Sequence, residues 1–334
     1  MSTISKSFGT MVNRDRLVSR LRHAPRVWTI GTILIVEIIV LTILSENFLT
    51  VTNLTNVARQ SALIGIASVG MTFVILLAGI DLSVGSVVGL SAMSSALVVR
   101  NTGVEQLGIP VAVATGALCG VVTGLMVSKL KIQPLIATLV MLSVLKSITL
   151  MLSDGSPVPL ESSLMRTIGT GRALGVPYAA WLFLLVVLIA HWVLAHTTFG
   201  RRLYAVGGSP DAANAAGIRV NVYRFAGYSI AGLLAGIASI VGAGRLGTAT
   251  PLLGEGLELD VIAAVIVGGT SLFGGVGTVW GSFVGVFILA FLRNGMVLLG
   301  VDAFWQLFAT GVVVLLAVLL DQFLSRVSGI RPEV

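Results

Sequence analysis

Long apolar stretches alternate with short polar, glycine-rich or proline-containing breaks along almost the whole chain. A helix needs about 20 consecutive apolar residues to cross the hydrocarbon core of a bilayer. The pattern therefore predicts an all-α polytopic membrane protein with about ten transmembrane helices, of which the third and the eighth are the shortest. The predicted spans cover residues 27–44, 56–79, 83–99, 109–128, 133–152, 179–196, 223–243, 258–273, 277–296 and 304–323.

The composition supports this class. Of the 334 residues, 56% are hydrophobic and only 10% are charged, and the mean hydropathy is +1.01. A soluble domain is nearer about 45–50% apolar and about 25% charged. The 39 glycines suit helices that approach one another closely in lipid. The single cysteine, Cys119, excludes an intramolecular disulfide.

The formal net charge of +7 has a simple explanation in a membrane protein. If the N-terminus is cytoplasmic, 14 of the lysines and arginines fall in cytoplasmic segments and 6 in external ones. This is the bias that the positive-inside rule describes, so nucleic-acid binding is not expected. An even number of spans then places both the N-terminus and the C-terminus in the cytoplasm.

We expect one transmembrane domain with short appendages. Residues 1–26 form a basic cytoplasmic segment that is retained, because the apolar run after it is longer than a signal peptide requires. The transmembrane domain covers residues 27–324, and residues 325–334 form a cytoplasmic tail. Two connections are long for so compact a chain, one external (about 153–178) and one cytoplasmic (about 197–222), which suggests docking surfaces.

Several kinds of chemistry have no residues to support them. None of the four lysines follows a glycine, so the chain has no Walker A loop for ATP. No catalytic motif or metal-ligand cluster stands out, and we expect neither a metal nor a catalytic residue. A secondary transporter, the second candidate function, needs ionisable groups inside its spans. The available ones are Glu37, Asp81, Lys146 and Asp260.

The cytoplasmic loop carries the clearest local signal. After "FGRR" comes a predicted glycine turn, Gly207 and Gly208, followed by Ser209-Pro210-Asp211. Ser209 or Asp211 can cap a short alanine-rich helix, and Gly217 is a suitable residue for its C-terminal end. On these features alone, a structural surface helix and a docking helix are both open.

Four segments resemble the ABC importer permeases of the ribose/arabinose/xylose/galactose branch. The sequence Asp211-Ala-Ala-Asn-Ala-Ala-Gly217 resembles the "EAA" coupling segment of that family, with Asp where Glu is usual and Ser209 where Asn is usual. The four segments occur in family order. They are "GMTFVILLAGIDLSVGSVVGLSA" (70–92), "KIQPLIATL" (131–139), "TTFGRRLYAVGGSPDAANAAGI" (197–218) and "GLELDVIAAVIVGGTSLFGGVGTVWGS" (256–282).

The resemblance implies a permease subunit that imports a monosaccharide across the bacterial inner membrane. It implies three protein partners: a second, often identical permease; a separate cytoplasmic ATPase that binds ATP and Mg; and a periplasmic or lipid-anchored sugar-binding protein. Membrane lipid surrounds the subunit, and this chain itself needs no cofactor. The coupling-loop residues that it implies are Gly200, Arg201, Gly207, Gly208, Asp211, Ala212, Ala213 and Gly217.

Two glycine-flanked breaks are candidate hinges or gates. "VILLAGIDLSVG" and "VIVGGTSLFGGVG" echo each other, either as a degenerate repeat or by compositional chance, and both breaks are expected on the cytoplasmic side. Asp81 either caps the next helix with Ser83 or acts in the gate. The candidate residues are Gly79, Asp81, Ser83, Gly85, Gly268, Gly269, Gly274 and Gly275.

Overall fold

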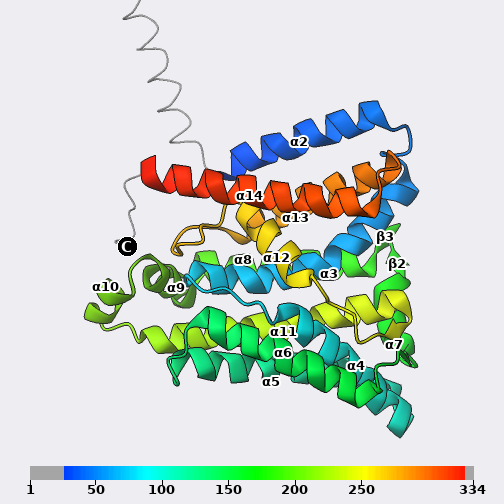
Figure 1. Ribbon diagram of the computed structural model, residues 1–334, viewed down its shortest axis with the longest axis horizontal. Helices are drawn as coiled ribbons and strands as arrows, with labels where there is room; N and C mark the ends of the chain where they lie inside the picture. The colour runs from blue at the N-terminus through cyan, green and yellow to red at the C-terminus, as the bar shows by residue number, and fades with distance from the viewer. Residues whose placement is uncertain (1–25, 328–334) are drawn as a thin grey trace, which may run out of the picture.

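The computed structural model describes residues 26–327, most of them in helices that run between two ends of the molecule (Figure 1). The expected N-terminal segment and C-terminal tail lie almost wholly outside these residues. The helices are α2 (Arg26–Leu44), α3 (Val51–Leu76), α4 (Val84–Thr102), η1 (Glu105–Leu107), α5 (Gly108–Ser128), α6 (Pro134–Ser153), α7 (Ser163–Thr170), α8 (Tyr178–His196), α9 (Thr198–Gly208), α10 (Pro210–Ala215), α11 (Val220–Leu246), α12 (Leu257–Val267), α13 (Val279–Leu298) and α14 (Ala303–Val327).

The polytopic all-α class is confirmed, with one correction to the spans. Seven described helices are long and apolar enough to cross a membrane, namely α3, α4, α5 with η1, α6, α8, α11 and α13. In α2 and α14 the apolar stretches are shorter, Ile30–Leu44 and Ala303–Leu316. The predicted span over 258–273 is wrong, because α12 has only 11 residues. It ends where positive φ angles begin, and these occur at Gly269, Gly274, Gly275 and Gly277.

The two long loops lie at opposite ends of the molecule, as the sequence predicted (Figure 1). One end carries α7 and four two-residue strands, in which β1 (Val158–Pro159) pairs with β4 (Thr248–Ala249) and β2 (Arg172–Ala173) pairs with β3 (Val176–Pro177). The other end carries α9 and α10. The start of α2 and the end of α14 also lie there (Figure 1), so both ends of the described chain share the side of the 197–222 loop.

Glycines allow the two central helices α5 and α11 to touch backbone to backbone. A Cβ on Gly120 would lie 2.6 Å from the carbonyl oxygen of Tyr228 and 2.9 Å from the Cα of Gly232. A Cβ on Gly116 would meet Gly232 and Gly236 equally closely. Small residues four apart are the usual means of close helix packing in lipid. This crossing therefore depends on the absence of side chains at these glycines.

Charged groups within the helices are only partly paired. Arg293, which was counted among the 6 basic residues of the external segments, lies inside α13 and makes a bidentate ion pair with Asp260 of α12. Its Nε donates to the hydroxyl of Thr310 in α14 at 3.3 Å, which joins three helices. Glu37, another ionisable group of the predicted spans, lies in α2. Its buried Oε2 has no hydrogen-bond partner among the described residues.

The glycine crossing makes a direct prediction. Gly120→Leu should destabilise the protein by about 1–3 kcal/mol or more, because overpacking forces a backbone shift. The matched control is Gly311→Leu in α14, where an added Cβ meets nothing within 4 Å. Thermal unfolding of the two variants in the same detergent measures the difference. Equal melting temperatures would show that the α5–α11 crossing is not tightly packed.

Candidate functional site

The 197–222 loop folds into two short helices whose ends are set by local sequence. The Ser209 hydroxyl accepts a hydrogen bond from the Ala212 N–H at 3.2 Å, and Pro210 occupies the first turn of α10, so the predicted serine cap is confirmed. Gly217 follows α10 with φ +79°, in agreement with its predicted role. The predicted turn at Gly207 and Gly208 is wrong, since both residues belong to the last turn of α9.

Helix α10 exposes most of its surface. Asp211 and Ala212 are exposed, as are 214–217, whereas Ala213 is 3% exposed and packs into the main core. Ala213, one of the expected coupling-loop residues, therefore fixes α10 to the rest of the chain, and the exposed residues around it form the accessible face of the helix. Arg201 is exposed on α9, and Gly200 sits too close to the Leu194 backbone to allow a side chain.

Two breaks interrupt the helices, the first at residues 77–83 and the second at 268–278. Helix α9 packs against both of them at one point, which we call the glycine junction (Leu76, Ala78, Gly207, Gly274 and Gly275). The N–H of Gly275 donates to the carbonyl oxygen of Leu76 at 2.9 Å. A Cβ on Gly207 would overlap that same oxygen. The junction thus joins the end of α3, the segment 268–278 and the end of α9 through their backbones.

Tyr204 provides a second link between α9 and the segment 268–278. Its hydroxyl donates to the carbonyl oxygen of Gly277 at 2.8 Å. Burial raises the pKa of this phenol, so Tyr204 remains a neutral donor at physiological pH. Helix α9 is therefore fixed to the second break by a side chain as well as by the glycine junction.

The first break, residues 77–83, contains the predicted Asp81 turn. Oδ1 of Asp81 accepts from the Ser83 N–H at 2.9 Å and from the Ser83 hydroxyl at 2.6 Å. Ser83 precedes α4 and its side chain caps no helix N–H, while among the described residues Asp81 bonds only to Ser83, so the helix cap expected from sequence does not form and the two residues make a local side-chain turn instead. Such a side-chain turn is a common way to satisfy backbone N–H groups.

The structure places Asp81 in the protein interior. The residue is 3% exposed, and burial raises the pKa of its carboxyl group although the two hydrogen bonds from Ser83 act in the opposite direction. Its neighbour Gly79 lies under Tyr228 of α11, whose hydroxyl oxygen would be 2.5 Å from an added Cβ. The turn is therefore buried, and its expected position on the cytoplasmic side stays a prediction.

The remaining hinge candidates lie at separate contacts. Gly85 of α4 packs on the backbone of Gly254, and Gly268 packs on Gly281 at the start of α13. Gly269 has φ +80° and begins the second break. Sequence reasoning missed Tyr204 and Gly254. A tyrosine two residues after "FGRR" gives no local signal for a bond to residue 277.

The geometry allows a displacement of α10 and α9 to reach both breaks. No flexible side chain separates Gly207 from Leu76 or Gly275, so α9 cannot shift without moving the ends of α3 and of the segment 268–278. The fold and this arrangement define a multi-pass membrane transport protein whose loop helices are rigidly joined to its broken spans. Packed interfaces of this kind switch between discrete arrangements.

Comparison with known proteins identifies the family. The chain belongs to the family described as "Branched-chain amino acid transport system / permease component", whose sequence model matches residues 53–319. It is a transport subunit and not an enzyme, in a family of multi-pass inner-membrane proteins. Permease components of such systems work with an ATPase and a substrate-binding protein. The resemblance to ABC importer permeases is thereby confirmed.

Several relatives are similar over most of their length. The ribose import permease protein RbsC of Escherichia coli K12 is 44% identical over 292 residues, which cover 86% of this chain and 91% of the relative. The L-arabinose ABC transporter permease protein AraH of Azospirillum brasilense is 33% identical over 329 residues and 97% of both chains. The D-allose transport system permease protein AlsC of E. coli K12 is 35% identical over 301 residues, 89% of this chain and 92% of the relative. No solved structure matches this chain.

Adjacent glycines in α9 allow a matched test of the junction. Gly207→Ala places a methyl group against the Leu76 carbonyl, whereas an added Cβ on Gly208 meets nothing within 4 Å. We expect Gly207→Ala to lower the melting temperature in detergent by several degrees and to abolish transport in the complete transporter. Gly208→Ala should melt like the wild type. Equal stability of the two variants would contradict the close contact at Gly207.

The Asp81 turn makes a separate prediction. Asp81→Ala leaves the Ser83 N–H without its partner in the interior, which should cost about 1–3 kcal/mol of stability. Asp81→Asn retains one acceptor oxygen and should cost less. If Asp81→Asn is stable but transports nothing, the carboxyl group acts in the gate. If Asp81→Asn is stable and active, the role of Asp81 is only to stabilise the turn.

Proposed function

We propose that this chain is the permease subunit of an ATP-driven, binding-protein-dependent importer of a monosaccharide in the bacterial inner membrane. The observation that carries the proposal is the junction of α9 with both broken spans, next to the exposed surface of α10. A separate cytoplasmic ATPase can bind the exposed surface of α10. Because α9 contacts both breaks through its backbone, a movement of α10 is transmitted to the membrane-spanning helices. The printed names of the relatives, which concern ribose, L-arabinose and D-allose, support a monosaccharide as the cargo.

The end that carries α9 and α10 is the cytoplasmic end in this proposal, and both termini lie on the same side. The support is the charge distribution, because 14 of the basic residues fall in segments assigned to that side and, with Arg293 now inside α13, 5 in those assigned to the other. Arg201 and Arg219 are exposed there. The opposite end, with α7 and the short strands, then faces the sugar-binding protein.

The complete transporter contains two permease copies of this chain, surrounded by lipid, and an ATPase on a separate polypeptide. ATP and Mg are bound by that ATPase, since this chain has no Walker A lysine. Closure of the ATPase displaces α10, and α9 carries the displacement to the glycine junction. The ends of α3 and of the segment 268–278 then move together, and the spans exchange outward-open and inward-open packings.

The cargo and the energy source are tested together by uptake. Proteoliposomes that contain the permease, its ATPase and its binding protein should accumulate a labelled monosaccharide. Orthovanadate should stop uptake and a protonophore should not. Uptake that collapses with the proton gradient and needs no ATPase would instead indicate a secondary transporter. Failure of every monosaccharide to raise the melting temperature of the binding protein would exclude a sugar cargo.

The docking role of α10 predicts the effect of one exposed alanine. Ala216→Trp enlarges the exposed surface of the loop and should abolish both uptake and stimulation of the ATPase by the binding protein. The melting temperature of the isolated permease should not change, because Ala216 is exposed. Ala213 is a poor probe, since a bulky side chain there disturbs the core.

The control for this variant lies on another helix at the same end. Ala195→Trp in α8 adds the same bulk at an exposed alanine outside α10, so it should leave uptake unchanged. Normal coupling in Ala216→Trp would show that the ATPase does not dock at α10. Loss of uptake in both variants would show that added bulk alone, and not its position, disturbs the transporter.

A further inference from the structure

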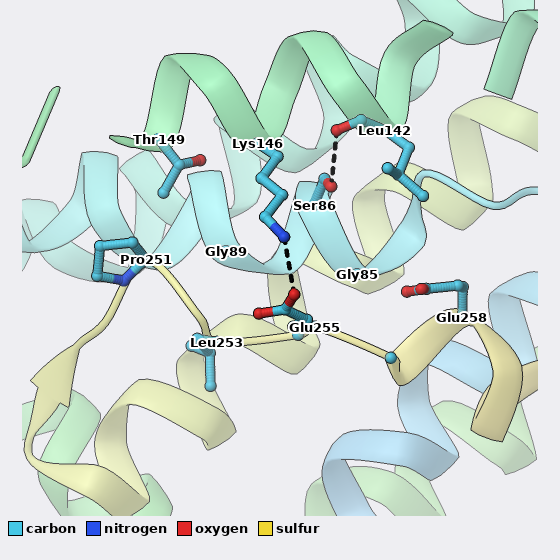
Figure 2. Close-up of a pocket in the computed structure, with 12 residues that line it drawn as sticks. Gly85, Ser86, Gly89, Leu142, Lys146, Thr149, Pro251, Leu253, Glu255 and Glu258 are labelled. Atoms are coloured by element: carbon cyan, nitrogen blue, oxygen red, sulfur yellow. Dashed lines mark hydrogen bonds and ion pairs between the residues drawn. The ribbon is translucent and has the colours of Figure 1, made fainter. Parts of the chain in front are cut away.

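A charged cleft lies between α4, α6 and the segment that leads into α12 (Figure 2). Its empty space is about 450 Å³, including the part open to the outside. We call it the α4–α6 cleft. Its polar side chains come from Ser86 of α4, Lys146 and Thr149 of α6, and Glu255 and Glu258. None of these residues takes part in the glycine junction.

The centre of the cleft is an ion pair between Lys146 and Glu255. The Lys146 Nζ lies 2.8 Å from Oε1 of Glu255, and the side chains are 40% and 55% exposed. Lys146 stands near the middle of α6, one of the seven helices long and apolar enough to cross a membrane. Ionisable groups at such positions face a bundle interior or a water-filled space, since contact with lipid is unfavourable.

Helix α8 shows how a lipid-facing surface looks in this same chain. Its exposed large side chains include Leu185, Leu188 and Ile189, all apolar. The exposed surface of α6 is also mostly apolar, with Leu139, Val140 and Val144 among its exposed side chains. It differs from α8 in carrying Ser143 and Ser147 beside Lys146, so this polar strip along the cleft is the part of α6 that suits water.

Close backbone packing forms one side of the cleft. Gly89 of α4 lies under the carbonyl oxygen of Leu253, which would be 2.8 Å from an added Cβ. The loop with Glu255 is thus seated on the glycine face of α4. The Ser86 hydroxyl is already used, because it donates to the Leu142 carbonyl at 2.9 Å. The Glu258 carboxyl group points into the cleft from the other side (Figure 2), so the charged groups of the cleft are an ammonium and two carboxyls.

We propose that the α4–α6 cleft is part of the wall of the transport pathway and contacts the hydroxyl groups of the passing sugar. The inference rests on the proposed function for the identity of the cargo. A sugar hydroxyl both donates and accepts hydrogen bonds, the Lys146 ammonium donates, and the carboxylates of Glu255 and Glu258 accept. Because the ion pair is exposed, a hydroxyl can reach both partners. Charge-assisted hydrogen bonds are the stronger kind.

Cysteine accessibility tests the position of the cleft. In a Cys119→Ala background, Lys146→Cys and Glu255→Cys are compared with Leu188→Cys of α8, in proteoliposomes that hold the complete transporter. A charged, membrane-impermeant methanethiosulfonate reagent reacts with thiolates that water reaches. We expect both cleft cysteines to react at least about tenfold faster than the α8 cysteine. Reaction no faster than in α8 would overturn the proposal.

Sugar dependence tests the contact itself. Saturating monosaccharide, delivered by the binding protein, should slow the reaction of the cleft cysteines and leave Leu188→Cys unaffected. Glu255→Gln should raise the sugar concentration for half-maximal uptake about tenfold with little change in melting temperature, because the pair is exposed. A structural role predicts the opposite, a lower melting temperature and an unchanged half-maximal concentration. That result, or labelling that sugar does not slow, would overturn the contact with sugar.

The two proposals fail in distinguishable ways. If the wild-type transporter takes up no monosaccharide, the proposed cargo is wrong, and the labelling rates still show whether the cleft faces water. If the wild type takes up sugar and the cleft cysteines react only as slowly as the α8 cysteine, the cargo is right and the pathway lies elsewhere.

Discussion

The hydrogen bond from the Gly275 N–H to the Leu76 carbonyl oxygen is the interaction on which the rest of the structure depends. Inside a membrane, backbone groups have no water to bind, so a helix can break only where protein satisfies the groups that it frees. Here the first break supplies an acceptor and the second supplies a donor. The two interruptions of the spans therefore stabilise each other. Gly207 of α9 packs directly against both partners of this hydrogen bond.

This shared contact explains how a surface helix can act on the membrane interior. Helix α9 is held to the second break through Gly207 and through the Tyr204 hydroxyl bond to Gly277. Helix α10 is anchored by Ala213 and exposes its other residues. A partner that binds the exposed face therefore moves a rigid unit and not a loose loop. In the proposed cycle, the cleft around Lys146 opens to alternate sides as the breaks shift.

Local features were predictable from the sequence, and contacts between distant residues were not. The Ser209 cap and the Gly217 terminus follow from turn chemistry within a few residues, and the two breaks were found from their glycines. The contact of Gly207 with Leu76 and Gly275 joins three segments that are far apart in the sequence, so a local sequence pattern cannot predict it. For the same reason the sequence predicted a turn at Asp81 but not its burial, which leaves the residue 3% exposed. Helix α12 looked like a span because apolar residues continue past Val267, while backbone angles at the following glycines end the helix.

The central claim is that α10 and the second break move as one body. Spin labels at the exposed positions Asn214 and Phe273, in a Cys119-free chain paired with an unlabelled copy, measure the distance between them by electron–electron double resonance. The account predicts the same distance distribution in the nucleotide-free transporter and in the vanadate-trapped one. In a second sample, labelled at Asn214 alone in both copies, the distance between the two Asn214 labels should change. A shift of the Asn214–Phe273 distance as large as the change between copies would contradict it.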